Sequence, residues 1–142
     1  MVQISKNFLF YLALSTQLLI IGCEGVEDTY RRKELVSSKG EKIYINTLNW
    51  GVTDDYQFTI VTKDMNKLMS RSDTLDAIKG LEPFIYKFSG DTLFLYANKE
   101  IKIAVQDSFQ TIKIIFDQVD HSNYMNLTYK AGQGVEGYQL VP

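Results

Sequence analysis

From residue 41 onward, apolar and polar side chains alternate with a period of two along most of the chain. Residues 42–48 place Ile43, Ile45 and Thr47 on one face of an extended segment, and such alternation predicts a β-strand with one buried face. The same pattern, rich in β-branched and aromatic residues, predicts further strands at 56–63, 83–89, 91–98, 101–106, 111–119, 124–131 and 138–141. A succession of short strands indicates an all-β domain.

The turns between these segments favour one architecture. Ser89, Gly90 and Asp91 form a short link typical of a β-hairpin. Only residues 63–80, KDMNKLMSRSDTLDAIKG, interrupt the alternation, and they predict a long loop. The sequence therefore predicts an antiparallel β-sandwich, Ig-like or similar, of about seven or eight strands over residues 41–142. A β-barrel is the alternative, because the strand pattern does not show whether a sheet closes.

The N-terminus follows a different pattern. Lys6 is the only charged residue among the first 22, and residues 8–21 form an apolar stretch. A permanent helical span needs about 20 apolar residues, so this stretch is short for one. A basic start followed by a short apolar run is typical of a secretory signal, which we assign to residues 1–22.

The only cysteine, Cys23, follows this stretch directly. The tetrad Ile20-Ile21-Gly22-Cys23 resembles the lipobox of bacterial lipoprotein signal peptides. The resemblance implies cleavage between Gly22 and Cys23, a diacylglycerol on the Cys23 thiol and an N-acyl lipid on its amino group. Two or three acyl chains anchor a protein stably to a membrane, so the domain would be tethered and not membrane-spanning.

Residues 23–40 then form the expected lipidated N-terminus and tether, because the stretch is polar and offers few core candidates. Glu24, Glu27 and Asp28 resemble the acidic export signals of surface lipoproteins. The expected location is the outer membrane, facing either the periplasm or the cell surface, and not the cytoplasm.

Two longer stretches, NWGVTDDYQFTIVT at 49–62 and EPFIYKFSGDTLFLY at 82–96, together with the lipobox, resemble small β-rich lipoproteins of Bacteroidota. The shared motifs are structural and imply no reaction. The triplet Asp-Thr-Leu at 73–75 and 91–93 resembles the short O-glycosylation motif of secreted Bacteroidota proteins, which makes Thr74 and Thr92 candidate acceptors.

Charge and length limit the function. The length of 142 residues fits one domain. The net charge of −2 means that the chain lacks the excess of basic residues that binds nucleic acid. The single histidine, His121, lies in a turn-like stretch, so the sequence gives no indication of a catalytic triad. The acidic residues lack the spacing of a calcium loop, so we predict no metal site and no cofactor beyond the lipid on Cys23.

Trp50 is the only tryptophan, and it ends a predicted strand beside Gly51. It is a candidate ligand platform, since an aromatic ring can stack on a sugar, and core packing is the alternative. The sequence therefore predicts a non-enzymatic binding module at the cell envelope, whose partner is an envelope protein or a glycan. The alternative function is an envelope hydrolase that acts on glycans or peptides.

Overall fold

The computed structural model describes residues 28–51 and 56–142. The described residues form a mostly β fold of eight strands in two four-stranded sheets, with one α-helix and one 3₁₀ helix. The first sheet has the strand order β1 (Thr29–Val36), β2 (Lys42–Trp50), β3 (Tyr56–Thr62) and β4 (Ile78–Lys79). The second has the order β7 (Lys113–Val119), β6 (Thr92–Asn98), β5 (Ile85–Ser89) and β8 (Gln139–Leu140). The helices are α2 (His121–Gly132) and η1 (Val135–Gly137).

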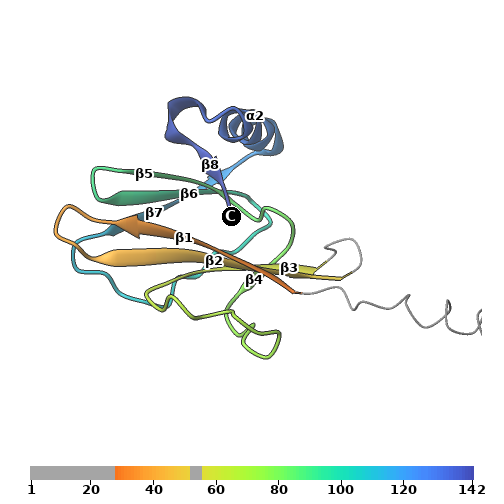
Figure 1. The fold of residues 1–142 in the computed structure, drawn as a ribbon. Coiled ribbons are helices and arrows are strands. Elements are labelled where there is room, and N and C mark those ends of the chain that lie inside the picture. The colour runs from red at the N-terminus through yellow and green to blue at the C-terminus, as the bar shows by residue number, and fades with distance from the viewer. Residues whose placement is uncertain (1–27, 52–55) are drawn as a thin grey trace, which may run out of the picture.

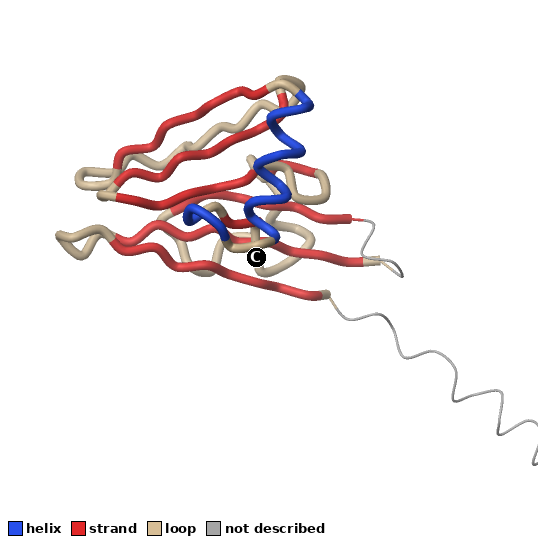
Figure 2. The backbone as a smooth tube through the Cα atoms, turned by 90° about the horizontal axis from the view of Figure 1, so that it is seen from above, coloured by secondary structure: helices blue, strands red, loops and turns tan. Residues whose placement is uncertain are grey.

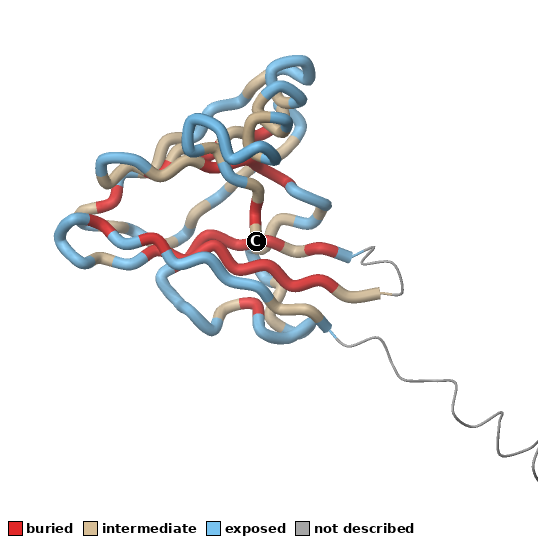
Figure 3. Tube along the Cα trace, turned by 45° about the horizontal axis from the view of Figure 1, so that its top comes forward, coloured by how far each residue is buried: buried red, intermediate tan, exposed pale blue. Residues whose placement is uncertain are grey.

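The two sheets pack face to face and enclose the main core (Figure 1). Ile43 and Ile45 of β2 are fully buried, as are Leu93 and Leu95 of β6 on the facing sheet. Burying one such side chain contributes about 1.5–3 kcal/mol to the free energy of unfolding. Buried positions fall mainly on the facing strands (Figure 3). Neither sheet closes on itself in the described part of the chain, so the arrangement is sandwich-like.

A second, smaller core lies on the outer face of the first sheet. The segment predicted as a loop at 63–80 is a loop that ends in the short strand β4 at Ile78–Lys79, which the sequence did not predict. This loop at 63–80 folds over the face and inserts Leu68 against Leu48 and Ile60. Asn46 of β2 donates from Nδ2 to the carbonyl oxygens of Asp64 and Lys67, at 3.1 and 2.8 Å. The loop is therefore a packed layer on the sheet, held by both apolar and polar contacts.

The helix α2 lies on the outer face of the second sheet, on the opposite side of the molecule from the loop at 63–80 (Figure 1). Seen from above, it crosses the strands (Figure 2). Asp120 caps its start by accepting from the Asn123 backbone N–H at 2.9 Å. Tyr124 anchors it, donating from its hydroxyl to the Glu82 carbonyl oxygen at 2.7 Å.

Six of the predicted strands are present, as β2, β3, β5, β6, β7 and β8. The strand predicted at 124–131 is wrong, because these residues belong to α2. The strand predicted at 101–106 is also wrong, because this stretch pairs with no strand. Residues 29–36, which we expected in the tether, form the edge strand β1.

The prediction of a purely antiparallel arrangement is wrong at one pair. β6 and β7 run parallel, with Thr92 opposite Lys113 and Asn98 opposite Val119. Parallel neighbours need a crossover of a dozen or so residues, and residues 99–112 supply it. This crossover shapes the candidate site.

Candidate binding cavity

The crossover at 99–112 is extended but unpaired over much of its length. Ile101, Ile103 and Val105 are half-buried against the main core, while the residues between them are exposed. Residues 102–109 make no backbone–backbone hydrogen bond to other described residues. The segment thus has the side-chain alternation of a strand without a strand's partner.

A cavity of about 630 Å³ lies between this crossover and the second sheet. Its walls come from β6, the crossover and β7: Leu95, Ala97, Ile101, Lys102, Ile103, Ala104, Phe116, Asp117 and Gln118. Most of these side chains are apolar, and Phe116 is 47% exposed although it lies on the inner side of β7. Pockets of about 300–1,000 Å³ with mostly apolar walls and a few polar groups are typical ligand sites.

The polar groups at the cavity come from Lys102, Asp117 and Gln118. β7 is an edge strand, with β6 on one side and no described strand on the other. Its outer edge therefore presents backbone N–H and C=O groups beside the cavity. Such an edge can pair with an added extended segment.

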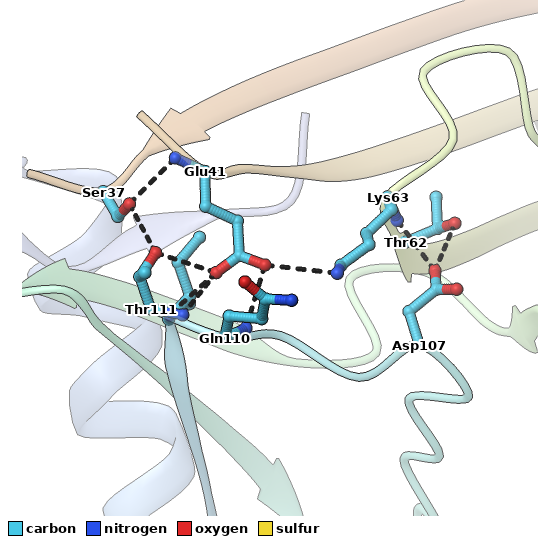
Figure 4. A network of polar contacts seen from close by, with 8 residues as sticks. Ser37, Glu41, Thr62, Lys63, Asp107, Gln110 and Thr111 are labelled. Atoms are coloured by element: carbon cyan, nitrogen blue, oxygen red, sulfur yellow. Dashed lines mark hydrogen bonds and ion pairs between the residues drawn. The ribbon is translucent and has the colours of Figure 1, made fainter. Parts of the chain in front are cut away.

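Glu41 fixes the far end of the crossover to the β1–β2 turn (Figure 4). Its carboxylate accepts from the backbone N–H groups of Gln110, Thr111 and Ile112 at 2.9, 2.6 and 3.1 Å. It also accepts from the Thr111 hydroxyl at 2.8 Å and pairs with Lys63 Nζ at 3.1 Å. The Gln110 N–H, followed by the other donors, lowers the pKa of Glu41 to about 2, against an opposing desolvation cost.

Asp107 fixes the middle of the crossover to the end of β3. It accepts from the Thr62 hydroxyl at 2.8 Å and from the Lys63 backbone N–H at 2.7 Å (Figure 4). A smaller cavity of about 220 Å³ separates the crossover from the edge of β3. These side-chain contacts hold the crossover beside β3 without backbone pairing.

The predicted hairpin is confirmed, and its Asp91 also connects the two sheets. Gly90 and Asp91 both have positive φ, 55° and 58°, between the paired residues Ser89 and Thr92. The Asp91 carboxylate accepts from the backbone N–H and hydroxyl of Ser38, at 2.7 and 2.5 Å. These donors lower the pKa of Asp91.

Trp50 lies on the outer face of the first sheet, away from the cavity. Its ring stacks on Phe58 and Tyr56 with centroids 4.9 and 5.8 Å apart, and both ring pairs are nearly parallel. The Arg71 guanidinium lies 5.5 Å from the centroid of the Trp50 ring. The candidate platform is therefore one member of an aromatic row already engaged with side chains of its own chain.

The two candidate acceptor threonines lie in different settings. Thr74 is half-buried in the loop at 63–80, and Thr92 is the half-buried first residue of β6. Asp73 beside Thr74 accepts from the Leu68 backbone N–H at 2.8 Å and pairs with Lys67. Both acidic residues of the triplets thus have structural contacts, whereas the predicted modification of either threonine stays a prediction. Gly22 and Cys23 lie outside the described residues.

His121 is the exposed first residue of α2, and the neighbouring Asp120 carboxylate is occupied by its cap contacts to Asn123. Within residues 28–51 and 56–142, no group of three or more His, Cys, Asp or Glu side chains is placed to hold a metal ion. In the same ranges no helix has both the length and the apolar character needed to cross a bilayer.

Comparisons with protein families, with curated proteins and with solved structures found no match.

The cavity was not among the sequence-predicted sites. The alternation at 101–106 gave no signal for it, because an unpaired segment with one half-buried face has the same pattern as a paired strand.

Proposed function

We propose that this chain is an envelope lipoprotein, anchored to the outer membrane by a diacylglycerol and an N-acyl lipid on Cys23, whose domain is a non-enzymatic binding module. The lipobox resemblance and the position of the single cysteine support the anchor. In this proposal the two sheets act as a sandwich scaffold, Ig-like or similar, that holds the crossover and β7 in fixed positions.

The observation that carries the binding role is the cavity of about 630 Å³ between the crossover and β7. It combines apolar walls with an exposed aromatic side chain, Phe116. The hydrogen bonds of Glu41 and Asp107 hold the crossover, which is the outer wall of the cavity, in place before a ligand binds. Binding therefore costs less conformational entropy of the crossover.

The ligand class that fits is an extended apolar segment of an envelope protein. Edge strand β7 offers backbone donors and acceptors, and the cavity offers a place for an apolar side chain of the added segment. A glycan fits less well, because sugar recognition needs many side-chain hydrogen bonds and this cavity has three polar residues, Lys102, Asp117 and Gln118.

The test is selection of linear peptides from a random phage-displayed library on the chain from residue 23 onward with Cys23→Ser. Selected peptides should carry apolar residues at alternate positions, and binding should slow hydrogen exchange of the β7 amides. Phe116→Lys should weaken binding of the synthetic peptides at least about tenfold by calorimetry.

Tyr129→Lys is the matched control, since Tyr129 is an exposed aromatic residue on α2 and lies away from the cavity. It should leave the peptide affinity unchanged. Equal weakening by both variants, or exchange protection confined to other strands, would contradict the proposed site.

The anchor has a separate test. Cells that express the full chain should incorporate labelled palmitate into it, and Cys23→Ser should abolish the label and release the protein from the membrane fraction. A Cys23→Ser variant that still carries the palmitate label would contradict the lipobox interpretation.

A further inference from the structure

The outer face of the first sheet carries a group of exposed apolar side chains. Met69 is 56% exposed and Leu75 is 74% exposed in the loop at 63–80, and Met65 and Tyr56 are also exposed. Because the loop packs its Leu68 inward against the sheet, Met65, Met69 and Leu75 lie on its solvent side, and Tyr56 is the exposed first residue of β3. We call Tyr56, Met65, Met69 and Leu75 the loop surface.

Aromatic and basic residues border the loop surface. The row Tyr56, Trp50 and Phe58 stacks along the end of β2 and β3. Arg71 lies over Trp50, and Lys79 Nζ lies 4.9 Å from the centroid of the Tyr56 ring. Tryptophan, tyrosine and long basic side chains are enriched where protein meets the headgroup region of a bilayer, because each joins an apolar body to a polar end.

The chain enters the domain beside this surface. Asp28, the first described residue, accepts from Arg71 Nε through both carboxylate oxygens at 3.0 Å. Asp28 is five residues after Cys23. Five residues span at most about 18 Å whatever their conformation, so a lipid on Cys23 keeps this part of the domain close to the bilayer.

We infer that the loop surface rests on the membrane, with Met69 and Leu75 inserted at the headgroup boundary and Trp50 close to it. The inference rests on the proposed lipid anchor. Residues 63–80 contain four basic and three acidic residues, so apolar insertion and not lipid charge provides the contact. The helix α2 lies on the opposite side of the molecule and faces away from the bilayer (Figure 1).

The single tryptophan makes the inference measurable. The chain from residue 23 onward is coupled through Cys23, its only thiol, to a maleimide lipid in phosphatidylcholine vesicles, with or without brominated acyl chains. Bromine quenches tryptophan fluorescence at short range. Trp50 emission should be strongly quenched, and Met69→Ser combined with Leu75→Ser should remove most of the quenching.

The control variant combines Met125→Ser with Tyr129→Ser, two exposed residues on α2, and it should be quenched like the unchanged chain. Replacing part of the phosphatidylcholine with phosphatidylglycerol should leave the quenching unchanged. Equal quenching of the unchanged chain and the Met69→Ser/Leu75→Ser variant would overturn the inference, as would quenching that requires the anionic lipid.

The chemical tether separates this inference from the proposed function. Coupling to the maleimide lipid replaces lipidation in the cell, so a failure of palmitate labelling leaves the vesicle experiment interpretable. Conversely, palmitate labelling in cells without Trp50 quenching on vesicles would support the lipid anchor and contradict the proposed orientation.

Discussion

The Glu41 carboxylate accepts two hydrogen bonds from Thr111, one from its backbone N–H at 2.6 Å and one from its hydroxyl at 2.8 Å. These two residues are 70 positions apart, so their contact ties the β1–β2 turn to the end of the crossover. The crossover in turn forms one wall of the cavity, which makes Glu41 a positioning residue for the proposed binding site.

Glu41→Gln should lower the melting temperature at pH 7 by several degrees, because an amide can neither accept all these hydrogen bonds nor pair with Lys63. The pKa of Glu41 lies below its usual 4.5, at about 2 in the fold, so its stabilisation is present above pH 4.5 and is lost as the pH falls toward 2. Calorimetric melting between pH 2 and 7 should therefore give a shallower acid decline for the variant. Glu34→Gln is the control, because the Glu34 carboxylate pairs with Lys42 on the surface, and the loss of such an exposed ion pair should change stability little.

Asp91 should tolerate asparagine better than alanine. Asparagine keeps an acceptor for the Ser38 N–H and adopts positive φ readily, whereas alanine loses the contact and is strained at φ 58°. We expect thermal melting to show a small decrease for Asp91→Asn and a clearly larger one for Asp91→Ala. If the two variants melt together, the link between the two turns contributes nothing to stability.

Leu68→Ala should lower the free energy of unfolding by about 2–5 kcal/mol, the usual range for a buried leucine. Leu68 is fully buried between its loop at 63–80 and the first sheet, so the same change should also speed hydrogen exchange of the loop amides. Urea unfolding followed by Trp50 fluorescence measures the first effect. Leu75→Ala removes the same atoms from an exposed position and should change stability by no more than about 0.5 kcal/mol.

Tyr86→Phe should weaken the attachment of β8. The Tyr86 hydroxyl donates to Gln139 Oε1 at 2.6 Å, and such a bond contributes about 0.5–1.5 kcal/mol. Burial raises the pKa of Tyr86 from 10 to about 12, so stability that is complete below pH 10 is lost as the pH rises toward 12. Alkaline unfolding should start at higher pH in the variant; an unchanged alkaline transition would show that ionisation of Tyr86 does not drive it.

The strands with one clean apolar face could be predicted, and the exceptions have separate physical causes. Met125, Leu127 and Tyr129 alternate as in a strand, but Tyr124, Leu127, Thr128 and Ala131 have helical spacing, and in α2 these are among the positions that face inward. The cap signal at Asp120 and Asn123 was the stronger guide to this helix.

The sequence pattern did not predict β1, and the reason is different. Arg31, Arg32, Lys33 and Glu34 are all exposed, because an edge strand at the open side of the first sheet needs few buried side chains. Its pairing comes from the backbone of β2, which leaves no periodic trace in side-chain polarity. The cavity could not be predicted either, since it depends on the parallel placement of β7, a long-range choice that local alternation does not encode.

Two of the edge strands, β1 and β7, differ in how well their side chains protect them against pairing with another chain. The charged side chains of β1 protrude on both faces of that strand and discourage pairing with another chain. β7 exposes Phe116 and carries the apolar pair Ile114 and Ile115, so it has no charged side chain between Lys113 and Asp117. We therefore expect the purified domain to self-associate through β7 as its concentration rises, and light scattering measures this association.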